Sequence, residues 1–333
     1  MGSPVSSPVA GPVIAVLTIV SGRHDHLRGQ LLGLAAQERA PAWHVVAAMG
    51  DPAVRDVLDE VPAAPGTRRV VVDVPLPEGG AGELPLAAAR NAAATAAVER
   101  GAELLVLLDV DCVPSPALVA TYARAAASDV VRAAAGPVLL CGPVAYLPPA
   151  VRVTSAADLA RLPGAAEPHR ARPAPGPGQV VLAGPDQWWL FWSLSFATTA
   201  RDWHRAGGFC EDYRGYGGED TDVAATVRSL GGSLFWVGGA DAHHQHHAVE
   251  SPPVRHLEAI VRNAAVFHGR WGWWPMTGWL ERFRENGLVD YDAAADTWSL
   301  TAPVSAPASP ADSPPDSPPD SAGDEAAASS TCS

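Results

Sequence analysis

The most constraining feature of this 333-residue sequence is an unbroken apolar run that ends abruptly in two carboxylates. Residues Leu104–Leu108 are all apolar, without the alternation of a half-exposed strand, and Asp109 and Asp111 follow directly. Such a run is typical of a strand covered on both faces, in a mostly parallel sheet flanked by helices. In such sheets, ligands bind at the carboxyl ends of the strands. The run therefore predicts a layered α/β fold with a ligand site beside the two aspartates.

Apolar strands and helical segments alternate along the chain, which predicts a parallel sheet because such alternation forms βαβ units. In the first third, strands are expected at residues 13–20, 43–48 and 69–74, and helices at 27–37, 54–61 and 86–100. Further along, helices are expected at 117–127, 202–206, 219–230 and 253–268, and strands at 135–140 with an extension at 144–147, at 188–197 and at 233–237. Residues 243–247 are expected in a loop. We therefore predict one large α/β domain over residues 13–300.

Three segments have compositions that disfavour regular structure. Residues 1–12 are rich in Ser, Pro and Val, and residues 301–333 in Ala, Pro, Ser and Asp, so both ends are predicted to be disordered. Residues 148–178 are rich in proline and are predicted to form a long loop with one helical piece at 156–162. Because long loops are uncommon inside compact domains, this one is expected to be functional, such as a lid, or disordered.

The composition excludes several classes of partner. The net charge is −13 and the basic residues are all arginines, so we expect no general binding of nucleic acid or of an anionic membrane surface. No apolar run reaches the roughly 18 residues that span a bilayer, and the N-terminus lacks the pattern of a secretory signal. The four cysteines show no metal-type spacing. We expect a cytoplasmic protein with reduced thiols, and the absence of lysine beside abundant Ala, Arg and Pro points to a high-GC bacterial source.

Two groups of residues are candidate metal ligands. Asp109 and Asp111 repel each other, so such a pair is usually neutralised by a cation, and hard oxygen ligands suit Mg²⁺, Mn²⁺ or Ca²⁺. The run His243-His-Gln-His-His247 holds four imidazoles, and neutral imidazole is a common metal ligand. Carboxylate and imidazole together favour Mn²⁺ over Mg²⁺. The alternatives are a solvated turn for the aspartates and a polar surface loop for the histidines.

A further acidic cluster, Glu219-Asp220-Thr-Asp222, directly follows two glycines. The glycines permit a tight backbone path, and the carboxylates fall in the first turn of a helix, where free N–H groups stabilise their charge. The alternative is an ordinary acidic helix start. The residues before it favour a wall for a sugar ring, because three of them are aromatic: Phe209, Tyr213 and Tyr216. The 11 tryptophans are interpreted mainly as core, with one or two lining a site.

Taken in order, these motifs resemble those of GT-A-fold glycosyltransferases. The N-terminal strand, Ala-Arg90-Asn91 and the strand that ends in Asp109-Val-Asp111 are similar to the family 2 inverting enzymes. The later segment Gly-Gly-Phe…Gly-Tyr-Gly-Gly-Glu-Asp resembles the C-terminal catalytic region of β-1,4-galactosyltransferases, shared with polypeptide N-acetylgalactosaminyltransferases. The resemblance covers residues 13–250. It implies a GT-A, Rossmann-like fold, with a nucleotide-sugar-binding half and an acceptor and catalytic half: residues 13–115 and 116–300.

The resemblance implies a set of metal ligands. Asp111 is expected to bind Mn²⁺ or Mg²⁺, which bridges the donor diphosphate. Asp109 is expected to contact the metal or the donor ribose. One histidine completes the metal shell, with His244 favoured and His247 and His246 as alternatives.

The resemblance also implies roles in catalysis and in sugar binding. Asp220 is expected to be the base that deprotonates the acceptor hydroxyl, while Glu219 helps to hold the sugars. Arg90 would contact donor phosphate or sugar. Asp51 would approach the nucleobase, although here Ala-Met-Gly displaces the family's usual strand-end acid. The expected contacts with the acceptor or sugar are four: Tyr216, Gly218, Trp192 and Asp222.

The expected activity is metal-dependent transfer of a sugar from a nucleotide-sugar donor of the UDP class to an acceptor hydroxyl. Inversion is expected if a single in-line displacement occurs, although the related N-acetylgalactosaminyltransferases retain configuration. The acceptor, a glycan, small molecule or protein, is not identified by any motif. Two other classes stay open. A metal-dependent nucleotidyltransferase or phosphohydrolase would release pyrophosphate or phosphate without sugar transfer, and a non-catalytic sugar- or metal-binding module would show no turnover.

Overall fold

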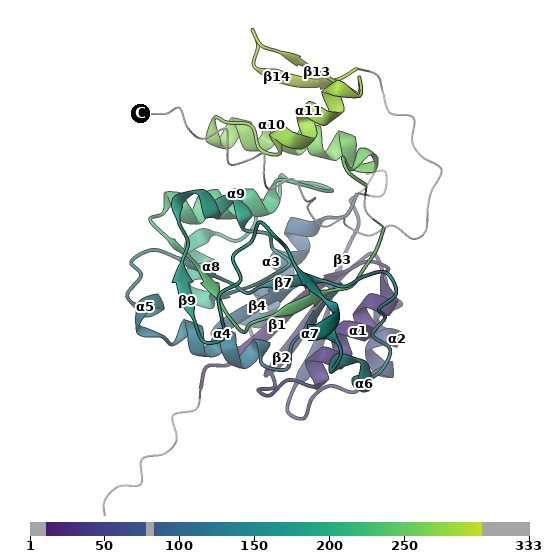
Figure 1. Ribbon diagram of the computed structural model, residues 1–333, viewed down its shortest axis with the longest axis vertical. Helices are drawn as coiled ribbons and strands as arrows, with labels where there is room; N and C mark the ends of the chain where they lie inside the picture. Colours follow the sequence, from purple (N-terminus) through teal and green to yellow (C-terminus); the bar gives the residue numbers. More distant parts are fainter. Residues whose placement is uncertain (1–10, 78–82, 249, 302–333) are drawn as a thin grey trace, which may run out of the picture.

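The centre of the molecule is an eight-stranded sheet in the order β3-β2-β1-β4-β10-β6-β11-β9 (Figure 1). The computed structural model describes residues 11–77, 83–248 and 250–301, so nearly all of both ends predicted to be disordered lies outside the described residues. The strands of this sheet are β1 (Ile14–Val20), β2 (Trp43–Met49), β3 (Arg68–Val74), β4 (Leu104–Leu108), β6 (Val138–Cys141), β9 (Val180–Leu182), β10 (Ser195–Thr199) and β11 (Ser233–Val237).

The sheet is mostly parallel, as the unbroken apolar runs predicted. Strands β3, β2, β1 and β4 pair in parallel, and so do β6 and β11. Strand β10 runs antiparallel to β4 and β6, and the edge strand β9 runs antiparallel to β11. Every residue of β1 and β4 is buried, which agrees with a strand covered on both faces. The prediction of one α/β domain around a mostly parallel sheet is confirmed.

Helices cover both faces of the sheet. Alternate residues of β1 point to opposite sides: Leu17 packs in the cluster that contains helix α3, and Val16 in the cluster that contains α4. The helices are α1 (His24–Ala35), α2 (Val54–Glu60), α3 (Leu86–Val98), α4 (Leu118–Ala126), α5 (Asp129–Arg132), α6 (Ala156–Leu159), α7 (Leu162–Ala165), α8 (Ala200–Ala206), α9 (Glu219–Ser229), α10 (Leu257–Trp271) and α11 (Thr277–Glu285). Two 3₁₀ helices are η1 (Pro185–Leu190) and η2 (Val254–His256). Within the described ranges, no helix is long and apolar enough to cross a membrane.

A second, four-stranded sheet in the order β5-β12-β7-β8 adjoins the first and corrects two predictions. Its strands are β5 (Cys112–Pro114), β7 (Val144–Tyr146), β8 (Glu167–Pro168) and β12 (Ala242–His244). Residues 144–147 do not extend the preceding strand, because β7 pairs with β12 in the second sheet; between the two strands, a side chain at Gly142 would collide with the carbonyl of Ala240. The histidine run was predicted as a loop, but its first two histidines belong to β12.

The strand predicted over residues 188–197 is wrong in its first half. Residues Pro185–Leu190 form η1, and the strand begins only at Ser195. Pro185 suits a helical start because its φ angle is preset and its missing N–H is not needed there. Trp188 and Phe191 are buried by packing rather than by strand pairing. An apolar run of this length does not distinguish a strand from a buried helical turn.

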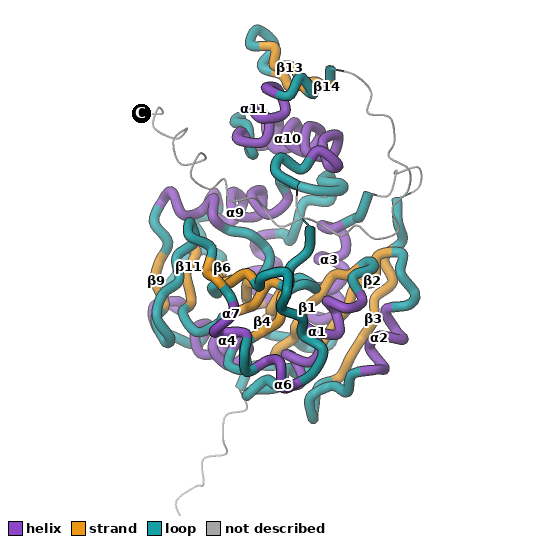
Figure 2. Tube along the Cα trace, turned by 45° about the vertical axis from the view of Figure 1, so that its right-hand side comes forward, coloured by secondary structure: helices purple, strands orange, loops and turns teal. Residues whose placement is uncertain are grey.

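The C-terminal part of the described chain forms a separate layer. In both views α10, α11 and the hairpin of β13 (Val289–Asp292) and β14 (Thr297–Leu300) lie apart from the central sheet, beyond α9 (Figure 1, Figure 2). This layer has its own apolar cluster, which includes Ile260, Leu280 and Phe283. Tyr216, from the loop before α9, packs into the same cluster. The layer therefore contacts the loop that leads into the predicted catalytic acids at the start of α9.

Candidate active site

The register of the second sheet brings the histidine run to Asp111. Strand β5 begins at Cys112, the residue after Asp111, and pairs antiparallel with β12 so that Cys112 lies opposite His244. The carbonyl of Asp111 also accepts a hydrogen bond from the backbone N–H of Gln245 at 2.7 Å. Segments about 130 residues apart in the sequence thus meet at the carboxyl end of β4.

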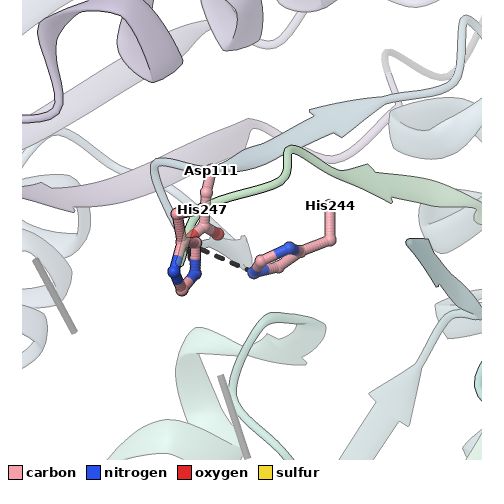
Figure 3. A group of neighbouring side chains, drawn as sticks. All are labelled: Asp111, His244 and His247. Carbon is pink, nitrogen blue, oxygen red and sulfur yellow. Dashed lines mark ion pairs between the residues drawn. The ribbon is translucent and has the colours of Figure 1, made fainter. Parts of the chain in front are cut away.

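Asp111, His244 and His247 form a compact group of possible metal ligands. One ligand atom from each lies within 4.8 Å of the others, and the three side chains converge from the loop after β4 and from β12 and its following loop (Figure 3). The Nε2 atoms of His244 and His247 lie 3.4 and 3.8 Å from Asp111 Oδ2. Within the described part of the chain, the buried Nε2 of His247 has no hydrogen-bond partner.

Arg23, at the N-terminus of α1, adds a positive charge to this group. Its Nη1 donates to Asp111 Oδ2 at 2.5 Å, and its side chain is 2% exposed. Burial by itself would raise the pKa of Asp111, but His244, Arg23 and His247 together hold that pKa well below its usual range. Burial and the charge of Arg23 lower the pKa of His247 to about 4. Near neutral pH, Asp111 is therefore an anion facing a neutral His247, which are the protonation states that a metal site requires.

Arg90 connects the carboxyl end of β4 to the start of α9. From α3, its Nη2 donates to Asp109 at 3.2 Å and its Nη1 to Glu219 Oε1 at 3.2 Å. Its guanidinium also lies over the ring of Phe209 at 5.1 Å. Burial raises the pKa of Asp109, and nearby Asp111 adds to that effect while Arg90 opposes it. The two aspartates of the motif thus differ: Asp111 faces the histidines, while Asp109 pairs with Arg90 and lies outside the metal-ligand group.

Asp220 lies in the first turn of α9, which begins after two glycines in the left-handed region. Gly217 and Gly218 have φ angles of 95° and 90°, where a side chain would be strained. Asp220 is partly exposed, and its Oδ1 accepts the N–H of Thr221 at 2.7 Å. The charges of Asp109, Glu219 and Asp220 all act to raise the pKa of Arg90, against the effect of its burial. The predicted base and the β4 motif therefore share one electrostatic environment.

Three amide side chains to which the sequence analysis gave no role hold these loops, and two of them, Gln30 and Asn263, are buried. Asn263 donates from Nδ2 to the carbonyls of Arg214, Tyr216 and Gly217 at 2.9–3.1 Å. Gln30 and Asn91 act in the same way. Gln30 Nε2 donates to the carbonyl of Asp109 at 2.7 Å, and Asn91 bonds both backbone groups of Phe209. A signal existed for two of them, because Gln30 and Asn263 interrupt apolar helix stripes, where a polar residue must find a partner.

The remaining predicted site residues lie at varied distances from this centre. Asp222 is 2% exposed and accepts hydrogen bonds from Tyr213, Arg270 and Trp271, so the structure gives it a bracing position. Tyr216 stacks between His256 and Trp279. Trp192 is buried against His169.

Two further predicted residues lie near α1. Asp51 Oδ2 accepts the N–H of Gly22 at 2.7 Å and lies 2.8 Å from His24 Nε2. It is thus held at the loop after β1 by Gly22 and His24, the two residues that flank Arg23 in the sequence. His246 lies outside the metal-ligand group, and its carbonyl lies 3.4 Å from His26 Nε2.

A family model matches one segment of the chain. Residues 182–249 match the model of the family described as the N-terminal domain of galactosyltransferase. The matched segment contains Glu219, Asp220 and all four histidines of the 243–247 run. A comparison with curated protein sequences found no match.

Solved structures share the fold at low sequence identity. The crystal structure of S. aureus TarS 1-349 in complex with UDP-GlcNAc superposes with a TM-score of 0.51 at 10% identity, covering 81% of this chain and 75% of that one. Mannosyltransferase PcManGT from Pyrobaculum calidifontis, in complex with GDP-Man and Mn²⁺, gives 0.47 at 18% identity and 80% and 67% coverage. GalNAc-T7 with UDP, GalNAc and Mn²⁺ gives 0.47 at 14% identity and 83% and 54% coverage. The chain spans about half to three-quarters of the lengths of these proteins.

The resemblance predicted from the sequence is confirmed in two ways. The segment that contains Gly-Tyr-Gly-Gly-Glu-Asp lies within the match to a galactosyltransferase family model, and the fold is that of GT-A glycosyltransferases.

Proposed function

We propose that this protein is a metal-dependent glycosyltransferase that moves a sugar from a nucleotide-sugar donor to an acceptor hydroxyl. The observation that carries the proposal is the meeting of two groups at one edge of the sheet. The Asp111, His244 and His247 group lies on one side, and Asp220 on the other, joined by the bridge from Arg90 to Asp109 and Glu219. The family match over residues 182–249 supports the same activity.

The donor set suits a divalent metal. One carboxylate and two imidazoles within 4.8 Å offer mixed oxygen and nitrogen ligands, and the buried Nε2 of His247 forms no hydrogen bond with any described residue. Asp111, His244 and His247 would hold the ion, and we favour Mn²⁺ over Mg²⁺ because of the imidazoles. When bound, such an ion supplies positive charge that stabilises a departing diphosphate.

Side chains of the protein would carry out proton transfer, charge neutralisation and donor recognition. Asp220 would accept the proton of the acceptor hydroxyl, because it is partly exposed and lies in the first turn of a helix, where free N–H groups favour a carboxylate. Arg90 holds Asp109 and Glu219 apart and neutralises their charge. Direct attack by the activated hydroxyl would proceed in one displacement and therefore with inversion. We propose a UDP-linked donor, with Asp51 as the acid closest to the nucleobase.

A panel of UDP-, GDP-, dTDP- and CDP-linked sugars, each with and without Mn²⁺, tests the proposal by thermal shift. We expect one nucleotide class to raise the melting temperature only with Mn²⁺, because a ligand at 100 times its Kd stabilises by about 2.7 kcal/mol. Asp111→Ala should abolish that shift. The matched control is Asp73→Ala, which removes an exposed carboxylate of β3 that pairs with Arg55. This variant should retain the Mn²⁺-dependent shift.

The other outcomes discriminate between classes. If Mn²⁺ alone stabilises the protein and no nucleotide sugar adds to its effect, the transferase proposal fails and a hydrolase or a metal-binding module takes its place. If Asp111→Ala keeps the Mn²⁺-dependent shift, the assigned metal group is wrong.

A further inference from the structure

Arg172 carries a buried guanidinium for which the described residues supply no anion. The residue is 6% exposed and lies between β8 and β9, in the proline-rich segment predicted as a long loop. Within residues 11–77, 83–248 and 250–301, none of its three nitrogens, Nε, Nη1 and Nη2, has a hydrogen-bond partner. A guanidinium offers five N–H donors, so this is an unusual concentration of unmet hydrogen bonding.

Two tryptophan rings hold the guanidinium in place. Its Cζ atom lies 5.0 Å from the ring centre of Trp192 and 5.3 Å from that of Trp236. Cation–π attraction offsets part of the cost of removing the charge from water. The ring faces accept none of the in-plane N–H groups in a conventional hydrogen bond, so the N–H groups at the edge of the guanidinium still lack an acceptor such as an oxyanion.

Other arginines of the chain show how such a group is normally satisfied. Arg68 and Arg228 also lie over tryptophan rings, at 5.2 and 5.3 Å, but both residues are exposed to solvent. Arg90 is buried like Arg172 and pairs with two carboxylates. Arg69 is partly buried and donates to two backbone carbonyls. Stacking on an aromatic ring therefore does not by itself explain a buried arginine with no acceptor.

Arg172 lies at the same edge of the sheet as the metal-ligand group. Trp236 is the second-last residue of β11, and Cys141 is the last residue of β6. Burial raises the pKa of Cys141 to about 12, and the nearby charge of Arg172 opposes that rise. Arg172 acts in the same direction on the thiol of Cys112, the residue after Asp111. The positive charge of Arg172 therefore acts on groups at the carboxyl ends of the strands, where ligands bind in this class of fold.

A continuous row of rings leads from the metal-ligand group to Arg172. His244 lies opposite Tyr146 in the register of β12 and β7, with their ring centres 4.9 Å apart. Tyr146 is 5.9 Å from the ring of His169, which lies 4.7 Å from the ring of Trp192. Trp192 is the ring on which Arg172 rests. Aromatic and imidazole rings of this kind form walls against which sugar rings pack.

We propose that Arg172 binds an anionic oxygen group, a carboxylate or a phosphate, on the sugar that lies beside the metal-ligand group. The protein then acts on an acidic or phosphorylated sugar. The inference rests on the proposed glycosyl transfer and narrows its substrate class. The planar fork of a guanidinium matches the paired oxygens of such groups, and burial strengthens the interaction. Because its nitrogens are covered in this conformation, binding requires the segment between β7 and β9 to shift.

The anion can belong to the donor sugar or to the acceptor, and calorimetry with Mn²⁺ separates the two. The donor arm compares UDP-glucuronic acid with UDP-glucose. The acceptor arm compares glucuronate and glucose 6-phosphate with glucose, in the presence of UDP. We expect the anionic member of at least one arm to bind about tenfold more tightly than its neutral partner.

Variants assign that preference to Arg172. Arg172→Met, which keeps length but not charge, should reduce the preference to less than about threefold, and Arg172→Lys should retain part of it. Arg228→Met removes an exposed arginine stacked on Trp189 and should leave the preference unchanged. Arg172→Met should also melt no lower than the wild type, because it removes an unpaired buried charge.

The following results would contradict the assignment of anion binding to Arg172 or separate it from the transferase proposal. Equal binding of anionic and neutral sugars in both arms overturns it, and so does a preference that survives in Arg172→Met. If UDP-glucose binds with Mn²⁺ but no anionic sugar binds better, the inference fails while the transferase proposal stands. If no nucleotide sugar binds, the transferase proposal fails, and the acceptor arm repeated without UDP still tests Arg172. If Arg172→Met does not fold, Arg172→Lys gives the decision.

Discussion

Replacing Asp222 should cost stability rather than acceptor binding. Its carboxylate, 2% exposed, accepts Tyr213 Oη at 3.1 Å, Trp271 Nε1 at 2.7 Å and Arg270 Nε at 2.7 Å. In Asp222→Ala the hydroxyl and the indole N–H lose their acceptor in a buried place, at about 1–3 kcal/mol each. The Arg270 side chain is 40% exposed and can turn to water, so its share is small. We expect a loss of roughly 3 kcal/mol in the free energy of unfolding.

Urea unfolding followed by far-UV circular dichroism measures this loss. The midpoint should fall while the m-value stays constant, because the surface exposed on unfolding does not change. A loss of this size lowers the melting temperature by about 6–12 °C in a domain of this length. Asp222→Asn keeps one acceptor oxygen and should lose about half as much. Asp212→Ala, ten residues earlier and exposed, is the control and should change the free energy by less than about 0.5 kcal/mol.

A small effect would refute the reasoning. If Asp222→Ala loses less than about 1 kcal/mol, the three donors find other partners and the bracing position assigned to Asp222 is wrong. If the variant is as stable as the wild type but its KM for the acceptor rises, then the sugar-binding role predicted from the sequence is correct instead.

Three further predictions concern the base, the loop and a buried histidine. Asp220→Asn should keep Mn²⁺-dependent donor binding while kcat falls by about 10²–10⁴-fold, and full activity in a transfer assay would exclude it as the base. Asn263→Ala should lower the free energy of unfolding, measured in urea, by about 2–4 kcal/mol, because several backbone carbonyls of the loop before α9 lose their donor. Burial lowers the pKa of His44 from 6.5 to about 3, so it stabilises the fold fully above pH 6.5 and loses this contribution as the pH falls towards 3. Between pH 6.5 and 4.5 the loss is roughly 2–3 kcal/mol, and His44→Gln should flatten the fall in urea midpoint over this range.

Local patterns made the central sheet predictable. The apolar runs at β1 and β4 predict buried strands without any other information, because a strand covered on both faces needs apolar residues at every position. The predicted strand at 188–197 failed because a tryptophan-rich run has the same composition whether it pairs or merely packs. The hairpin of β13 and β14 was missed because its residues are mostly exposed and carry little apolar pattern.

The candidate site was predictable in its residue types and less so in its pairings. The sequence named Asp111 and His244, but only the register of β5 with β12 explains why they meet. It left Asp109 between the metal and the donor ribose, whereas in the fold Asp109 pairs with Arg90 and Asp111 faces the histidines. The different partners of the two aspartates depend on which elements face each carboxylate in the fold. Spacing along the chain does not contain that information.

Arg90 shows why the two halves of the chain depend on each other. It lies on α3, in the half predicted to bind the donor, yet one of its two carboxylate partners is Glu219 at the start of α9. Its other partner, Asp109, is two residues from the metal-ligand aspartate. Removal of either acid leaves an N–H group of this buried guanidinium without its acceptor, which costs about 1–3 kcal/mol. The position of the predicted base at α9 is therefore tied to the geometry of the β4 motif through one side chain, and a change at either acid is expected to disturb the other.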